Sequence, residues 1–427
     1  MNDLIKIRKR AIMNLESNPA PVGSVSLLKL KPKKLIMCFV WLCSILSITP
    51  NNVAAQSILP TSKDGAIAPD DWLIGKGRAW FYHGEPAAST SVIGSRAPTA
   101  EEKKVVDKAK ELFANRPAKV IALIDGRDVV YKDFKAPAND DSYLFSFSMG
   151  KTITSMAVGK AICAGKLQLT TRADEFIPEL KGKALGVATV RDLLRMASGT
   201  TGGDSDATMF TPAQNKLWTE GKLNLLDTIA EDRLSAAKKG VFSAYAPGEQ
   251  FWYKSTDPVT LGIMINRATG TTFAKWTTEN VLQQAGISSP VIIGEDKHGQ
   301  AQADGNYRMV MDDWIRFAIW VKDSSMEEGC FGDYVREATK TQIKNVQKNA
   351  GKFFDGYAYL LWTDTQYAPN TYWAVGYGGQ RIGWSLANKR LLVVFSNSEN
   401  WISELYELQR AWANAENGKK DTPQMFK

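Results

Sequence analysis

Segments with strand character lie near the two ends of this chain, and a long stretch of mostly helical pattern separates them. Near the start, VIALI and VVYKDF flank the turn DGRD at 125–128, which is typical of two paired antiparallel strands. Strand character returns at 356–362, 372–386 and 390–398. Between them, the region of about 167–300 is mainly helical in pattern. The sequence therefore predicts an α+β fold, in which an antiparallel sheet built from both ends of the chain carries an inserted, mainly helical region.

Two predicted helices flank this sheet in the sequence. The first runs from Thr99, which forms a capping box with Glu102, to Phe113. The second spans about 401–415. Of the 427 residues, 44% are hydrophobic, which is enough for a large core, and no repeat or low-complexity linker divides the chain. We therefore expect a single domain at 56–427.

The first 55 residues have the composition of an export signal. The apolar run LIMCFVWLCSILSI, 35–48, is too short to span a bilayer comfortably but suits a signal-peptide core. Small residues at Val53 and Ala55 suit a cleavage site, so the mature protein is expected to begin near Gln56, in the periplasm and with no stable membrane span. An uncleaved membrane anchor is the alternative, and Met13 is a second possible start.

Basic residues in this leader account for most of the charge of the chain. Eight of them, against two acidic residues, precede residue 56 and contribute +6 of the formal net charge of +8. The remainder is nearly neutral, so no nucleic-acid partner is expected.

Four cysteines are present, two of them, Cys38 and Cys43, in the leader. Cys163 and Cys330 remain in the mature chain, where an oxidising compartment would allow them to pair. Their spacing matches no disulfide or metal motif, however. We therefore expect both to be ordinary buried thiols.

The chain has only two histidines, which restricts the hydrolytic chemistry it can perform. His83 and His298 are far apart in the sequence, and neither belongs to an HExxH motif. No GxSxG motif is present to expose a serine for a Ser-His-Asp triad. We expect His83 in a packed, aromatic-rich turn and His298 in an exposed loop. Neither a metal nor an organic cofactor is expected.

A serine three residues before a lysine offers a different nucleophile and base. Ser148 and Lys151 open the segment SMGKTITSMAVGKAI. At positions i and i+3 of a helix, the amine can reach the hydroxyl. A lysine accepts a proton when burial or a nearby cation disfavours its charged form, and apolar residues such as Ile153 and Met156 suit a helix packed in the core. From this segment alone, a capping serine and a solvent-reaching lysine are the alternative.

Three further motifs follow in order: LLRMASG at 193–199, YKS at 253–255 and YGG at 377–379. Together with Ser148 and Lys151, they resemble the β-lactamase-like serine hydrolases, the superfamily of penicillin-recognising enzymes. Those enzymes carry SxxK, LLxxxSG, YxN or YxS, and KTG or a relaxed version of it. The resemblance covers about 118–397, and it implies the β-lactamase/transpeptidase-like fold.

The resemblance also implies roles for individual residues. The phenol of Tyr253 would share a proton with Lys151 and deliver it to the leaving group. Ser255 occupies the third position of that motif, where many members have asparagine. The backbone N–H groups of Gln380 and Ser148 would stabilise an oxyanion.

Departures at the third motif point to the substrate. Tyr377 stands where these enzymes commonly have the lysine that meets a substrate carboxylate, while Gly378 and Gly379 would let a substrate lie along the strand edge. Such changes are more typical of the esterases of the family and of members similar to 6-aminohexanoate-dimer hydrolase.

We therefore expect an exported serine hydrolase that cleaves a small ester or amide through an acyl-enzyme on Ser148. A D-alanyl peptidase or β-lactamase is the first alternative, and a non-catalytic ligand-binding relative is the second. The sequence does not indicate an oligomeric state.

Overall fold

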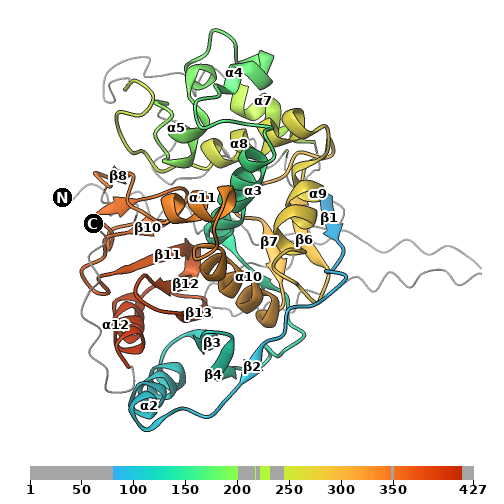
Figure 1. The fold of residues 1–427 in the computed structure, drawn as a ribbon. Helices are drawn as coiled ribbons and strands as arrows, with labels where there is room; N and C mark the ends of the chain where they lie inside the picture. The colour runs from blue at the N-terminus through green and yellow to red at the C-terminus, as the bar shows by residue number, and fades with distance from the viewer. Residues whose placement is uncertain (1–79, 201–216, 218–221, 231–244, 348–350, 416–427) are drawn as a thin grey trace, which may run out of the picture. The chain divides into compact units, whose positions relative to one another are not determined.

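The computed structural model describes residues 80–200, 217, 222–230, 245–347 and 351–415, all of which belong to one compact unit, Ala54–Lys427 (Figure 1). The predicted leader and its cleavage site lie outside the described residues. Within the described ranges, no helix has both the length and the apolar character needed to cross a membrane.

A nine-stranded sheet forms the centre of the fold, in the order β2-β4-β3-β13-β12-β11-β10-β9-β8. Its strands are β2 (Gly94–Ser95), β3 (Ala118–Asp125), β4 (Asp128–Phe134), β8 (Ile343–Lys344), β9 (Gly356–Tyr357), β10 (Trp362–Thr363), β11 (Thr371–Gly376), β12 (Gln380–Ser385) and β13 (Arg390–Ser396). Every pair is antiparallel except β2 with β4. Strand β3, from the start of the chain, pairs with β13, from its end. The predicted α+β fold with a sheet built from both ends is confirmed.

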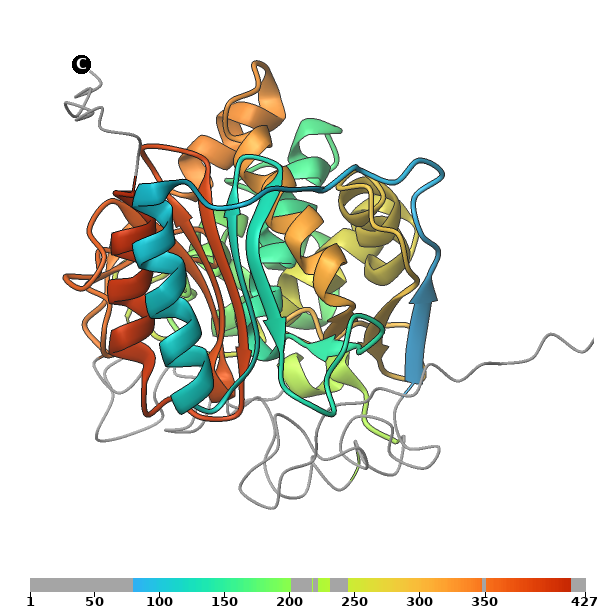
Figure 2. The same cartoon turned by 90° about the horizontal axis from the view of Figure 1, so that it is seen from below.

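Helices cover both faces of this sheet. On one face, α2 (Ala100–Asn115) and α12 (Ile402–Ala413) lie side by side (Figure 2). The indole N–H of Trp412 in α12 donates to the carbonyl of Ile124 in β3 at 3.0 Å. On the other face, α10 (Met311–Ser324) is joined to β12, because the indole N–H of Trp384 donates to the carbonyl of Ala318 at 2.9 Å. The capping box at Thr99 and Glu102 forms as predicted.

Further helices and short turns lie between the strands. The helices are α3 (Lys151–Cys163), α4 (Ala173–Phe176), α5 (Val190–Leu194), α7 (Leu225–Ala230), α8 (Thr256–Thr269), α9 (Phe273–Thr277) and α11 (Cys330–Ala338). The short 3-10 turns are η1 (Phe147–Gly150), η2 (Pro178–Leu180), η3 (Ala184–Val187) and η6 (Tyr377–Gly379), and η5 (Thr278–Leu282) is a π-helical segment that follows α9.

A second, four-stranded sheet, in the order β1-β6-β7-β5, was not predicted. Its strands are β1 (Trp80–Gly84), β5 (Leu144–Phe145), β6 (Val291–Glu295) and β7 (Tyr307–Met309). None is longer than five residues, which is too short for a clear alternating pattern. His83 lies on β1, the edge strand, and is exposed, so its predicted place in a packed turn is wrong. His298 lies in an exposed loop, as predicted.

Cys163 and Cys330 form a disulfide, with 5.7 Å between their Cα atoms, so the prediction of two unpaired thiols is wrong. Packing between α3 and α11 brings the two residues together. A Cβ added to Gly159 of α3 would lie 2.3 Å from the ring of Tyr334 in α11, which shows how closely the helices approach. The two cysteines are 167 residues apart, and no local spacing could reveal a contact of that kind.

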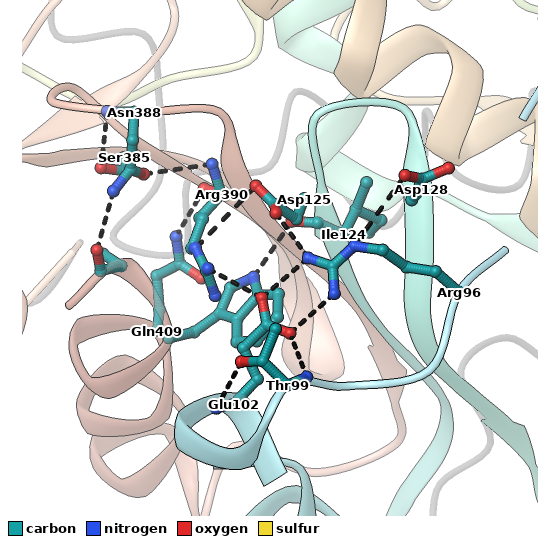
Figure 3. A network of polar contacts seen from close by, with 12 residues as sticks. Arg96, Thr99, Glu102, Ile124, Asp125, Asp128, Ser385, Asn388, Arg390 and Gln409 are labelled. Carbon is teal, nitrogen blue, oxygen red and sulfur yellow. Dashed lines mark hydrogen bonds and ion pairs between the residues drawn. The ribbon is translucent and has the colours of Figure 1, made fainter. Parts of the chain in front are cut away.

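An ionic network around the buried Glu102 joins segments from the early and late parts of the described chain (Figure 3). Glu102, at the start of α2, accepts hydrogen bonds from Arg96 at 2.7 Å and from Arg390 of β13 at 2.8 Å. Arg96 also donates to Asp125 at the end of β3, and the guanidinium of Arg390 lies 4.3 Å from the ring centroid of Trp412 in α12. The hydrogen bonds from Arg96 are the main reason that the pKa of Glu102 is lowered to about 2.

Candidate active site

Ser148 lies on the tight turn η1, immediately before α3, rather than inside a regular helix as the spacing predicted. Phe147, the residue before it, has φ of 45°, a backbone conformation that is rare for a residue with a side chain. Neighbouring segments impose this turn. Ser146 N–H donates to the carbonyl of Tyr307 at 2.9 Å, and its hydroxyl donates to the carbonyl of Gly305 at 2.7 Å. The backbone is therefore held in a strained conformation next to the serine, which is a common property of functional sites.

Lys151 is the first residue of α3, and its side chain is buried, with 1% of the residue exposed. Its Nζ atom donates to Ser148 Oγ at 2.8 Å and to the carbonyl of Asp304 at 2.6 Å. In the described part of the chain, no carboxylate forms an ion pair with this lysine. A buried amine is thus held against the serine hydroxyl by a backbone carbonyl.

Tyr253 is buried, and it approaches this pair with the face of its ring. The Nζ atom of Lys151 lies 5.2 Å from the ring centroid. Trp362 stacks on the tyrosine at 5.3 Å between centroids, and the backbone N–H of Tyr253 donates to Gln347 Oε1 at 2.7 Å. Within the described ranges, the phenol makes no hydrogen bond to Ser148 or Lys151. The structure therefore places Tyr253 beside the pair without the predicted hydrogen bond.

Ser255 is buried and directly precedes α8, two residues after Tyr253. A contact that the sequence did not reveal joins this segment to the LLxxxSG motif, because the hydroxyl of Ser198 donates to Asp257 Oδ1 at 2.8 Å. Asp257 also pairs with Lys254 Nζ at 3.4 Å. Burial raises the pKa of Asp257 to about 6 and lowers the pKa of Lys254.

The predicted third motif, YGG, lies in the turn η6 between β11 and β12. Gly376 packs against η1 so closely that an added Cβ would lie 2.3 Å from the carbonyl oxygen of Ser146. The ring of Tyr377 meets that of Phe147 edge-on, at 5.6 Å between centroids. Gly378 and Gly379 have φ of 76° and 100°, which favours glycine at both positions.

Two side chains that follow this turn hold it in place. Gln380 is buried, and its amide Nε2 donates to the carbonyl of Tyr377 at 2.6 Å. The guanidinium of Arg381 donates to the carbonyls of Gly376 at 2.6 Å and Gln380 at 2.9 Å. Gln380 is thus placed at the start of β12, next to η1, while its predicted use as an oxyanion donor stays a prediction.

Sequence reasoning missed Arg381, Asp304 and Gly376. Arg381 follows the YGG motif directly, and its position next to a glycine turn was a usable signal. Asp304 acts through its main-chain carbonyl, which carries no side-chain signal.

The arrangement can support nucleophilic chemistry on a carbonyl group. Ser148 is partly exposed, and a buried amine is in hydrogen-bonding contact with its hydroxyl. Those are the two parts that an acyl-transfer reaction needs from a nucleophile and its base.

Comparisons with known proteins identify the family and the fold. A β-lactamase family model matches residues 106–416. No curated protein matches the chain at a significant level. A putative 6-aminohexanoate-dimer hydrolase from Bacillus anthracis is similar in structure, with 17% identity, 79% of this chain and 91% of that chain covered, and a TM-score of 0.62. EstCE1, a hydrolase with promiscuous acyltransferase activity, is 14% identical, with 74% of this chain and 98% of that chain covered and a TM-score of 0.56. A putative β-lactamase from Bacteroides dorei DSM 17855 is 16% identical, with 72% of this chain and 98% of that chain covered and a TM-score of 0.55.

At these identities, the similar structures bear on the fold, and they confirm the predicted β-lactamase-like fold. The family model covers most of the chain. The protein therefore belongs to the β-lactamase family of serine hydrolases.

Proposed function

We propose that this protein hydrolyses an ester or amide through an acyl-enzyme formed on Ser148. The observation that carries the proposal is the 2.8 Å contact between Lys151 Nζ and Ser148 Oγ, with the lysine buried. A neutral amine at this position can take the proton of the hydroxyl as the oxygen attacks.

The proposed reaction has two halves. In the first, Ser148 Oγ bonds to the substrate carbonyl carbon and its proton passes to Lys151. The tetrahedral intermediate then collapses, and the leaving group departs with a proton returned from Lys151, with Tyr253 assisting. In the second half, water attacks the acyl-serine ester, gives one proton to the same groups, and releases the acid with Ser148 restored. During both attacks, the backbone N–H groups of Ser148 and Gln380 stabilise the oxyanion.

The sharpest test measures hydrolysis of a nitrophenyl ester by the wild type and by Ser148→Ala. The variant should lose hydrolysis, and a serine-directed fluorophosphonate should modify Ser148 in the wild type, as read by peptide mass spectrometry. Equal rates for the two proteins would remove Ser148 from the mechanism. An unmodified, inactive wild type would instead support the non-catalytic ligand-binding alternative.

One feature of the site favours another kind of ester or amide over the two special amides of the alternative, a β-lactam and a D-alanyl peptide. Tyr377 occupies the position where the family commonly has a lysine for a substrate carboxylate. Two similar structures are consistent with this choice, since one is described as a putative 6-aminohexanoate-dimer hydrolase and another as a hydrolase with acyltransferase activity. Covalent labelling of Ser148 by fluorescent penicillin would favour the alternative.

Export of the protein is part of the proposal. The disulfide between Cys163 and Cys330 supports it, because such bonds persist in oxidising compartments such as the periplasm. N-terminal sequencing of the protein recovered from a periplasmic extract should begin near Gln56. Recovery of an intact leader in the cytoplasmic fraction would contradict this.

A further inference from the structure

Tyr377 is unusually exposed for a large side chain in the middle of a buried turn. Its exposed fraction is 73%, whereas Gly376, Gly378 and Gly379 around it are buried. Gln380 and Arg381 hold the turn through its backbone carbonyls rather than through this ring. An aromatic ring exposed beside a reaction centre is available to a ligand.

A second aromatic ring stands next to it, from a segment far away in the sequence. Phe147, directly before Ser148, is partly exposed and meets Tyr377 edge-on at 5.6 Å between centroids. On its other side, the buried ring of Phe145 supports it at 4.4 Å. We call Phe147 and Tyr377 the aromatic shelf.

The position of the shelf relates it to the scissile bond. One of its residues directly precedes the proposed nucleophile, and the other lies three residues before Gln380, a proposed oxyanion donor. A substrate carbonyl bound between Ser148 Oγ and the backbone N–H of Gln380 would carry its substituents past the shelf.

The cationic side chains that contact these segments are buried and do not offer a site for an anion. Lys151 contacts Ser148, Arg381 contacts Gly376, and Arg308 lies 5.5 Å from the ring of Phe145. All three are buried, with exposed fractions of 1%, 3% and 1%. The surface next to Ser148 that these segments present is therefore aromatic rather than cationic.

We propose that the aromatic shelf binds an uncharged apolar group of the substrate, of the size of a phenyl ring, next to the scissile carbonyl. This proposal rests on the proposed function of Ser148 and adds the substrate class. An edge-to-face or stacked contact with two rings favours a flat apolar group over a carboxylate or a small alkyl group.

The test compares kcat/KM for pairs of esters that differ in one group. In the acyl series, the nitrophenyl esters of phenylacetate, acetate and succinate share a leaving group. In the leaving-group series, phenyl acetate and methyl acetate share an acyl group. For each protein we take the ratio of kcat/KM between the two esters of a pair. Comparing this ratio between a variant and the wild type cancels the intrinsic reactivity of each ester.

Tyr377→Ala should lower the phenyl-to-methyl ratio about tenfold in at least one series. Tyr377→Phe should keep the ratio, because it keeps the ring. Leu386→Ala serves as a matched control, since Leu386 is another exposed apolar side chain, at 50%, at the far end of β12. It should leave the ratio unchanged. Tyr377→Lys should shift the preference towards the anionic succinyl ester.

The proposal would be overturned if the ratio in Tyr377→Ala matched that of the wild type in both series, or if the wild type preferred the succinyl ester. Failure of the proposed function has a different signature, which is hydrolysis retained in Ser148→Ala. If no ester is hydrolysed, the rates at which benzyl and methyl fluorophosphonates modify Ser148 supply the same ratio. A Ser148 that neither reagent modifies overturns both proposals.

Discussion

Among the buried lysines of this structure, Lys151 is distinguished by what lies next to it. Lys254 is paired with Asp257, and Lys322 donates to two main-chain carbonyls behind β12, where burial lowers its pKa to about 8. Lys151 has one such carbonyl, from Asp304, and the hydroxyl of the partly exposed Ser148. Burying an ammonium without a carboxylate is costly, which favours a functional reason for its position.

Replacing this lysine should abolish most of the activity. We expect Lys151→Ala to lower kcat/KM by about 10²–10⁴-fold, because that is the typical contribution of a general base. The control is Lys160→Ala in the same helix, where the ammonium lies 3.9 Å from the ring centroid of Phe331 and makes no contact with Ser148. Steady-state kinetics on both, with thermal unfolding to show that they fold, make the comparison. Similar losses in the two variants would contradict the role of Lys151.

At the scale of elements, the site depends on close contacts between three backbone segments. Turn η1 carries Ser148, the loop at 303–306 supplies the carbonyl of Asp304, and η6 leads into Gln380. Gly305 and Gly376 make the contacts possible, since a Cβ on either would lie 2.3 Å from a backbone oxygen of Phe147 or Ser146. A side chain at either position must displace backbone rather than a flexible side chain.

Gly376→Ala should therefore reduce activity by about 10²-fold. Moving β11 away from η1 displaces the groups around the nucleophile, and a displacement of about 1 Å can cost that much. Gly126→Ala is the control. It lies in the turn between β3 and β4 with φ of 62°, and an added Cβ there meets nothing within 4 Å. That change should lower stability by about 1 kcal/mol and keep kcat/KM. Unaltered kinetics in Gly376→Ala would show that the contact with η1 does not matter.

These contacts also separate what the sequence could predict from what it could not. Strands β3, β4 and β13 and the cap of α2 follow local patterns of apolar and capping residues, and they were predicted. The motif residues were found because each carries a characteristic side chain. The carbonyl of Asp304, the approach of Gly376 and the pairing of Cys163 with Cys330 depend on tertiary packing, for which a single sequence has no local signal.

At the scale of the whole domain, the network around Glu102 holds together α2 and β3, from early in the described chain, and β13, from late in it (Figure 3). Through the contact of Arg390 with the ring of Trp412 it also reaches α12. Strand β13 pairs with β12, which begins at Gln380 directly after the turn η6. This network therefore supports the strand that begins beside Ser148.

Acid should weaken this network in a defined pH range. The pKa of Glu102 is lowered from 4.5 to about 2, chiefly by hydrogen bonds from Arg96, so the folded state favours its charged form. Its contribution to the free energy of unfolding is complete above pH 4.5 and is lost as the pH falls towards 2. The shift corresponds to on the order of 3 kcal/mol. Comparing the pH dependence of unfolding in urea for the wild type and Glu102→Gln isolates this contribution, because other carboxyls titrate in both proteins.

Glu102→Gln should be less stable at pH 7 and should lose less stability between pH 4.5 and 2 than the wild type. Glu404→Gln is the matched control, since Glu404 also binds an arginine, Arg116, at 2.7 Å, but at a surface position where both side chains are more than one third exposed. Exposed ion pairs contribute little, so this variant should follow the wild-type curve closely. If the two variants lost the same stability at pH 7, burial of Glu102 between Arg96 and Arg390 would not be what couples the early and late parts of the described chain.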